Sequence, residues 1–276
     1  MTNKLKDFLK NKLTKRELDI LPASFDVIGN IMIFSDFPEQ LEKKEKIIGN
    51  EILKNYKHIR SVFKKTKKFS GKFRTSKLSL LAGDKSRETL YKENNTRLKL
   101  DVEKVYFSSR SSTERKRIFQ LVKPNEIILV LFSGCGPYPI TISKNSQAEE
   151  IYSVEMNPTA CKYQEKNIKL NKIKNISLIK GDARRILSDS NKNFDRILMP
   201  LPKGAENFLD LALIRIKKQG IIHFYTFSEE DKYDNITDMI KDECKKKKKK
   251  CRILRTVKCG QFSPRVFRIC VDFKVS

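Results

Sequence analysis

Tryptophan is absent from this chain, and histidine occurs only twice among its 276 residues. The six cysteines include no C-x-x-C pair, and no spacing of cysteine and histidine is typical of metal ligands. These shortages disfavour a zinc site, and we expect no metal. The cysteines are interpreted as small buried apolar residues.

Long apolar runs are also missing, because no stretch approaches the ~20 apolar residues of a membrane span. The N-terminus is lysine-rich and polar and lacks the apolar segment of a secretory signal. We therefore expect a cytoplasmic protein with no membrane partner. The hydrophobic content of 39% is still sufficient to bury a core.

Acidic residues are few, since 33 Asp and Glu face 59 Lys and Arg and leave a net charge of +26. A charge of this size indicates a polyanionic partner, most directly nucleic acid, whereas a general lysine bias is the alternative. Residues 52–83 favour the first interpretation, because they hold ten basic residues and no acid, with Phe63, Phe69 and Phe73 interleaved. We predict an RNA-binding surface there, formed by Lys64, Lys65, Lys67, Lys68 and Lys72. The run Lys245–Lys250 is interpreted instead as a solvated helix end.

The stretch 127–140, IILVLFSGCGPYPI, predicts a buried strand that ends in a glycine loop. Neither Gly134 nor Gly136 has a Cβ that would keep a ligand from the backbone. Pro137 suits the first turn of a helix, where its missing N–H costs nothing. Three more apolar strands are predicted at 151–154, 176–179 and 194–198. Since strand ends of an open α/β sheet bind ligands, we expect a pocket along this edge.

The class of cofactor follows from which groups the strand ends supply. A dinucleotide site normally has a third glycine for the pyrophosphate, but Pro139 occupies that position. An adenosyl ligand without phosphates requires only a glycine turn, an acid for the ribose and a polar group beside the adenine. Glu155 and Asp182 can supply the last two, so S-adenosylmethionine fits better. The alternative is a domain without a cofactor, in which Asp182 only caps a helix.

The pattern of elements divides the chain near residue 110. Residues 1–110 predict a small α+β domain, with a strand at 27–34 and a helix at 40–56. Residues 111–276 repeat strand and helix, which indicates a mostly parallel, Rossmann-like sheet. Within this second part we expect helices at 205–217 and 227–248.

Between the two parts, residues 106–117 read YFSSRSSTERKR. This Phe-Ser-x-Arg-x-x-Thr-Glu-Arg pattern, the Phe-Ser-Gly-x-Gly-Pro loop and Pro200-Leu201-Pro202 together resemble the archaeal and eukaryotic tRNA (guanine-37-N1)-methyltransferases. The resemblance begins near Leu21. It implies a class I methyltransferase fold that uses S-adenosylmethionine beside the anticodon of tRNA.

The resemblance also implies roles for single residues. Glu114 would take the guanine N1 proton, because N1 is a poor nucleophile until that proton leaves. Arg74 would steady the charge that grows on O6, and Pro200 and Pro202 would border the base. Arg110 would contact RNA. The expected cofactor pocket comprises Tyr106, Arg115, Ser133, Gly134, Gly136, Glu155, Met156, Asp182, Ala183 and Pro200. Without the resemblance, Glu114 would be interpreted as a first-turn helix acid and Arg74 as one more basic residue.

Three positions or segments depart from the family pattern. Val130 stands where an Asp is usual before the glycine loop, and the extra N-terminal domain that grips the tRNA elbow is expected to be absent. Pro200 replaces the commoner Asn after the fourth strand, so a side-chain amide for the base edge is lost. A less prescriptive pocket should accept a larger base, as in the archaeal subgroup that also methylates the tricyclic wyosine intermediate.

We therefore predict a monomeric tRNA methyltransferase that forms N1-methylguanosine at position 37 and also C7-methylates 4-demethylwyosine. One alternative is the aminocarboxypropyl transferase of the wybutosine pathway. The other is a non-catalytic RNA-binding protein on a decayed methyltransferase fold. The acids Glu114, Glu155 and Asp182 argue against decay.

Overall fold

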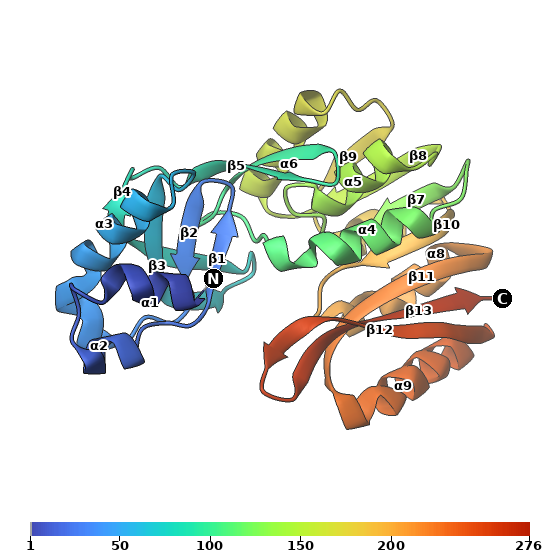
Figure 1. Cartoon of the computed structure of the whole chain (residues 1–276). Coiled ribbons are helices and arrows are strands. Elements are labelled where there is room, and N and C mark those ends of the chain that lie inside the picture. Colours follow the sequence, from blue (N-terminus) through green and yellow to red (C-terminus); the bar gives the residue numbers. More distant parts are fainter. Residues whose placement is uncertain (1) are drawn as a thin grey trace. The chain divides into compact units, whose positions relative to one another are not determined.

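The computed structural model describes residues 2–276, except for the side chains of residues 2–4 and 68–70. The chain forms two compact units, and each is described by itself (Figure 1). The first comprises Met1–Lys92 and Arg97–Ser109, and the second Glu93–Thr96 and Arg110–Ser276. Among the helices of the described residues, none is long and apolar enough to cross a bilayer.

The first unit is built on a four-stranded sheet in the order β1-β2-β3-β4. Strands β2 and β3 run parallel, and the other neighbours run antiparallel. Its elements are α1 (Thr2–Leu9), α2 (Lys15–Asp19), β1 (Phe25–Ile28), β2 (Ile31–Phe34), η1 (Glu39–Lys44), α3 (Glu45–Asn55), β3 (Ser61–Ser70) and β4 (Thr75–Gly83). The single strand predicted over 27–34 is wrong, because Gly29 adopts a φ of 59° and turns the chain between β1 and β2.

A hairpin follows, formed by β5 (Glu88–Glu93) and β6 (Thr96–Asp101). Asn94 and Asn95 both have positive φ, 41° and 59°, as a tight hairpin turn requires. The turn residues belong to the second unit, in which Asn94 Nδ2 donates to the Ser112 carbonyl over 3.1 Å.

The second unit has a seven-stranded sheet in the order β12-β13-β11-β10-β7-β8-β9. Strand β13 runs antiparallel to β11 and β12, whereas all other neighbouring pairs are parallel, so the predicted mostly parallel α/β fold is confirmed. Its strands are β7 (Ile127–Val130), β8 (Glu150–Glu155), β9 (Ile176–Lys180), β10 (Phe194–Met199), β11 (Ile216–Glu229), β12 (Cys251–Ser263) and β13 (Val266–Val275).

Helices cover both faces of this sheet. Helices α4 (Ser112–Leu121) and α5 (Pro137–Asn145) pack on one face with Ile128, Val130 and Tyr225, which are all buried. The opposite face carries α7 (Ala183–Asp189), α8 (Leu209–Arg215) and α9 (Tyr233–Lys246). The remaining elements are η2 (Ser109–Ser111), α6 (Pro158–Leu170), η3 (Ala205–Phe208) and η4 (Glu230–Lys232).

Two helices expected in the second unit have different bounds. The segment 205–217 is a short 3-10 turn followed by α8, and its last two residues already belong to β11. The helix expected over 227–248 begins only at Tyr233, because residues 227–229 continue β11 and pair with β13. The cysteines are largely as predicted, since five of six are buried and none is bonded to another.

Candidate active site

The glycine loop after β7 has the backbone conformation that its sequence predicts. Gly134 and Gly136 have φ of 59° and 90°, where side chains are disfavoured. A Cβ on Gly136 would also lie 2.8 Å from Ile140 and 2.9 Å from Gln164. Phe132 adopts a positive φ of 52° without being glycine, which is a strained conformation. The loop is therefore held in one shape and leads directly into α5.

Two buried amides of α6 hold this loop in place. Ser133 Oγ donates to Gln164 Oε1 over 2.9 Å, and Asn167 Nδ2 donates to the Cys135 carbonyl over 3.0 Å. Both amide side chains are fully buried. The sequence interpretation missed them, although their i, i+3 spacing places them on one helix face. Two amide side chains on one otherwise uncharged helix face could have indicated that this face is buried and forms hydrogen bonds.

Glu155, at the end of β8, is fixed by backbone groups of the neighbouring turns. Gly134 N–H donates to Oε2 over 2.7 Å, and the N–H groups of Met156 and Asn157 donate to Oε1 over 3.0 and 2.7 Å. Burial raises the pKa of the Glu155 carboxyl despite these donors. One acceptor position on Oε2 has no protein donor among the described residues, as a ribose hydroxyl would require.

The third strand end places Asp182 at the N-terminus of α7. Its Oδ1 accepts the Arg184 N–H over 2.8 Å, so it caps the helix that begins at Ala183. The Asp182 side chain is exposed. The preceding residue, Gly181, ties this strand end to β8, because its N–H donates to the Glu155 carbonyl over 2.8 Å. The cap and a ligand role are compatible, because the second carboxylate oxygen accepts from none of the described residues.

The fourth strand end is a tight turn. Leu201 N–H donates to the Met199 carbonyl over 2.8 Å, which leaves Pro200 at the apex and half-buried. Phe132 and Phe208 meet edge to face nearby, with ring centroids 4.9 Å apart. The loops after β7, β8, β9 and β10 thus lie at one edge of the sheet, since these strands are parallel neighbours.

Glu114 lies in the first turn of α4 with its carboxylate buried against β11. Arg117 binds it through two hydrogen bonds of 2.7 Å, and the Tyr225 hydroxyl donates to Oε1 over 2.6 Å. Burial raises the pKa of Tyr225 well above its ordinary value, so this hydroxyl stays a donor. These donors take up three of the four acceptor positions of the carboxylate and fix its orientation.

Arg115, the next residue, points elsewhere. Its guanidinium makes two hydrogen bonds with Glu93, one of them 2.6 Å long, and both side chains are almost fully buried. The guanidinium also lies 6.0 Å from the Tyr138 ring centroid. The structure thus gives Arg115 a packing role that the sequence interpretation missed, and its predicted place beside the cofactor stays a prediction.

The contacts of Glu114 continue into a buried chain of charges. Asp272 accepts from Arg117 over 2.5 Å and from His223 Nδ1 over 2.6 Å. Burial opposes ionisation of Asp272, but the bonds from His223 and Arg117 outweigh it and hold the pKa of Asp272 well below its ordinary value. Arg196 in turn binds Glu126 over 2.7 Å.

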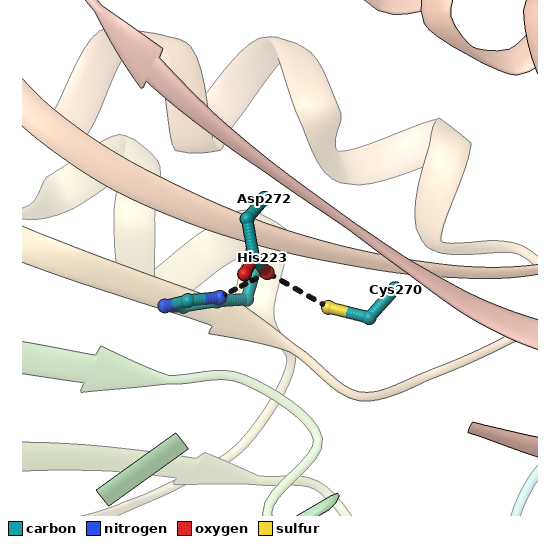
Figure 2. A group of neighbouring side chains, drawn as sticks. All are labelled: His223, Cys270 and Asp272. Carbon is teal, nitrogen blue, oxygen red and sulfur yellow. Dashed lines mark hydrogen bonds and ion pairs between the residues drawn. The ribbon is translucent and has the colours of Figure 1, made fainter. Parts of the chain in front are cut away.

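His223, Cys270 and Asp272 offer ligand atoms within 4.8 Å of one another (Figure 2). Arg196 Nη1 lies 2.7 Å from His223 Nε2 and can only donate, so Nε2 must accept and Nδ1 must carry the proton to Asp272. Burial lowers the pKa of His223, which agrees with this neutral tautomer. Arginines surround the group, so a cation is disfavoured there.

Two predicted site residues belong to the first unit. Arg74 ends the β3–β4 turn with a φ of 49°, and Tyr106 is half-buried. Their roles beside Glu114 stay predictions. Arg110 is exposed in the second unit.

The predicted RNA surface on β3 and β4 is corrected in two places. Phe63 is fully buried and unavailable to RNA. Lys64 is only 14% exposed and pairs with Glu42 and Glu45. Lys65 Nζ lies 3.2 Å from Ser35 Oγ, and Lys67 and Lys72 are exposed. The side chains of Lys68 and Phe69 lie outside the described residues.

Comparison with known proteins places this geometry in a family. Residues 89–254 match the model of the TRM5/TYW2 methyltransferase domain, and residues 5–86 match that of the TYW2 N-terminal domain. The tRNA (guanine(37)-N(1))-methyltransferase Trm5b of Pyrococcus abyssi is 41% identical over 93% of this chain and 76% of its own length.

Two other relatives are named for different activities. The tRNA (guanine(37)-N(1))/4-demethylwyosine(37)-methyltransferase Taw22 of Nanoarchaeum equitans is 38% identical, over 75% of this chain and 84% of its own. A tRNA(Phe) (4-demethylwyosine(37)-C(7)) aminocarboxypropyltransferase of Methanocaldococcus jannaschii is 32% identical, over 91% and 97%.

Solved structures agree with these sequence relatives. The crystal structure of Trm5b from Pyrococcus abyssi superposes with a TM-score of 0.87 at 39% identity, covering 96% of this chain and 78% of that one. A complex of aTrm5 with tRNALeu gives 0.85 at 32% identity, covering 99% and 78%. The predicted family resemblance is confirmed: the chain belongs to the TRM5/TYW2 methyltransferase family.

Proposed function

We propose that this protein transfers the methyl group of S-adenosylmethionine to N1 of guanosine 37 in tRNA. The observation that carries the proposal is the edge formed by the glycine loop, Glu155, Asp182 and the Pro200 turn. It occurs in a chain 41% identical to a Trm5b enzyme.

The donor groups at this edge fit S-adenosylmethionine. Glu155 retains one acceptor position for a ribose hydroxyl, and Asp182 retains an oxygen that faces solvent. Two acids also suit a ligand that carries a positive sulfonium. When bound, the cofactor supplies an electrophilic methyl group, and the protein has to position the base in line with it.

The role of Glu114 as the base comes from the family resemblance. Arg117 and Tyr225 orient its carboxylate through three hydrogen bonds, which take up three of its four acceptor positions. Catalytic hydrogen bonds commonly rearrange when substrate binds, so this geometry is compatible with the role. Its competitor is a purely structural anchor between α4 and β11.

The tRNA partner follows from the charge of +26 and from the tRNA complex of a similar structure. We assign the RNA contacts of the first unit to Lys67 and Lys72, which are exposed on β3 and its turn. A monomer, the absence of a metal and a cytoplasmic location remain predictions from the sequence.

A second activity, methylation of 4-demethylwyosine at C7, is favoured by Pro200. Proline offers no N–H and no polar side chain to the base edge, so Pro200 constrains that edge less than a side-chain amide would. The relative Taw22 carries both activities in its name. The competing aminocarboxypropyl transfer is favoured by the match of residues 5–86 to the TYW2 N-terminal domain.

One incubation separates these functions. The protein is mixed with labelled S-adenosylmethionine and either unmodified tRNA or tRNA bearing the tricyclic base, and the nucleosides are identified by mass. We expect a methyl group on both bases. An aminocarboxypropyl product would replace the proposal with its competitor, and no product on either RNA would favour a non-catalytic RNA-binding protein.

A further inference from the structure

Two phenylalanine rings stack on the surface of the second unit, and neither has a part in the site described above. Phe227 of β11 and Phe262 of β12 have ring centroids 4.1 Å apart and planes tilted by 32°. Phe262 is 65% exposed, the largest exposure among the large apolar side chains of the described residues. Leaving such a ring in water is unfavourable, so its outer face is available for a partner.

The register of the sheet locates this pair relative to the site. Strand β10 pairs with β11 as far as Met199 and Phe224, whereas β13 continues to pair with β11 as far as Glu229. The part of β11 from Tyr225 to Glu229, which pairs with β13 but not with β10, therefore projects roughly 16 Å past β10, at ~3.3 Å per residue. It projects at the edge where β10 ends in the Pro200 turn.

The rings also lie on the same face of the sheet as Glu114. Side chains alternate along a strand, so His223, Tyr225 and Phe227 share one face of β11. Tyr225 contacts Glu114 from that face. Phe227 is thus the next side chain along the row toward the edge, and Phe262 covers it from β12.

The charge beside the rings suits RNA. Arg265, in the β12–β13 turn, is exposed and forms no ion pair with any described residue. Single-stranded nucleic acids bind to surfaces where aromatic rings stack on bases while basic groups contact the backbone. A nucleobase is planar and of a size that matches one phenylalanine ring, so it can stack on the exposed face of Phe262.

We propose that Phe262, supported by Phe227, is a stacking platform for a nucleobase that flanks the target nucleotide of the RNA loop. This inference rests on the proposed function for the identity of the RNA. When the target base enters the site, its neighbour loses a stacking partner, and the exposed ring of Phe262 replaces it. The platform thereby adds affinity for an unpaired loop.

The test uses the whole chain and a tRNA transcript with 2-aminopurine beside position 37. We expect fluorescence quenching with the wild type and with Phe262→Tyr, which keeps the ring, but not with Phe262→Ala. Phe262→Ala should also bind the RNA roughly 5- to 150-fold more weakly, the range for one stacked base. Affinity for S-adenosylmethionine should be unchanged in every variant, which verifies folding.

Leu254→Ala is the matched control, because Leu254 is 39% exposed at the other end of the same strand. If Phe262→Ala bound the RNA and quenched 2-aminopurine as Leu254→Ala does, while methylation persisted, the stacking platform would be refuted. The proposed function would still stand. Should the wild type neither bind nor methylate the RNA, the proposed function would fail as well. Sedimentation tests the remaining alternative: a wild-type dimer that Phe262→Ala dissociates would make this surface a contact between copies.

Discussion

Glu155 is the residue on which we expect cofactor binding to depend most directly. Its carboxylate accepts from three backbone N–H groups, so Glu155→Ala should loosen the glycine loop as well as remove the proposed ribose partner. We expect weaker binding of S-adenosylmethionine by ~1–3 kcal/mol in calorimetry, the scale of a lost hydrogen-bonded partner. Glu165→Ala, which removes an exposed ion pair between Glu165 of α6 and Lys180 of β9, should bind the cofactor like the wild type. If Glu155→Ala bound S-adenosylmethionine as tightly as Glu165→Ala, the assignment of Glu155 to the cofactor pocket would be refuted.

Glu114 has two possible roles, and one substitution separates them. Glu114→Gln keeps the shape and an acceptor for Tyr225 but removes the basic carboxylate. If Glu114 takes the N1 proton, single-turnover methylation of guanosine should slow by about 10²–10⁴-fold with little change in tRNA or cofactor affinity. Methylation at C7 of the tricyclic base removes no N1 proton and should slow less. A guanosine rate near that of the wild type would make Glu114 a structural anchor.

At the scale of elements, the buried charges that join α4, β10, β11 and β13 make stability depend on pH. Burial lowers the pKa of His223, so the folded state keeps it neutral where the unfolded chain binds a proton. Neutral His223 therefore contributes its full stabilisation when the pH is above ~6.5, the ordinary pKa of histidine. Stability should therefore fall as the pH drops below it, by up to about 1.4 kcal/mol per pH unit.

His223→Gln tests this, because glutamine also donates and accepts but does not titrate. Urea unfolding between pH 7.5 and 5 should show a smaller loss of stability in this variant than in the wild type. The chain has one other histidine, the exposed His58, and His58→Gln should behave like the wild type. Identical pH profiles for His223→Gln and the wild type would contradict the neutral tautomer.

The elements also show what a sequence can predict here. Each parallel strand is a short apolar run that ends in a glycine, acid or proline, so the sheet and its loops were predictable from local patterns. The contacts of Glu114 were not, since Tyr225, which binds it, and Asp272, which shares Arg117 with it, lie more than 100 residues away and look like ordinary strand residues. The same holds for the start of α9, because pairing with β13 and not local propensity extends β11 to Glu229.

For the whole molecule, the charge of +26 predicts RNA binding that weakens steeply with salt through counterion release. Lys67 and Lys72 are exposed, so replacing both with alanine should reduce the slope of log K against log salt by about 1.4–1.8. Lys64→Ala should leave the slope unchanged, because its charge is already paired within the unit. If the slope changed in Lys64→Ala but not in the double variant of Lys67 and Lys72, the assignment of the RNA contacts to Lys67 and Lys72 would be wrong.

The most direct test of the central claim is the position and identity of the modified nucleoside. Two transcripts of one tRNA, with guanosine or adenosine at position 37, are incubated with S-adenosylmethionine and digested for mass spectrometry. We predict N1-methylguanosine at position 37 of the first transcript and no methylated nucleoside in the second. Equal methylation of both transcripts, or none of either, would contradict the proposed function.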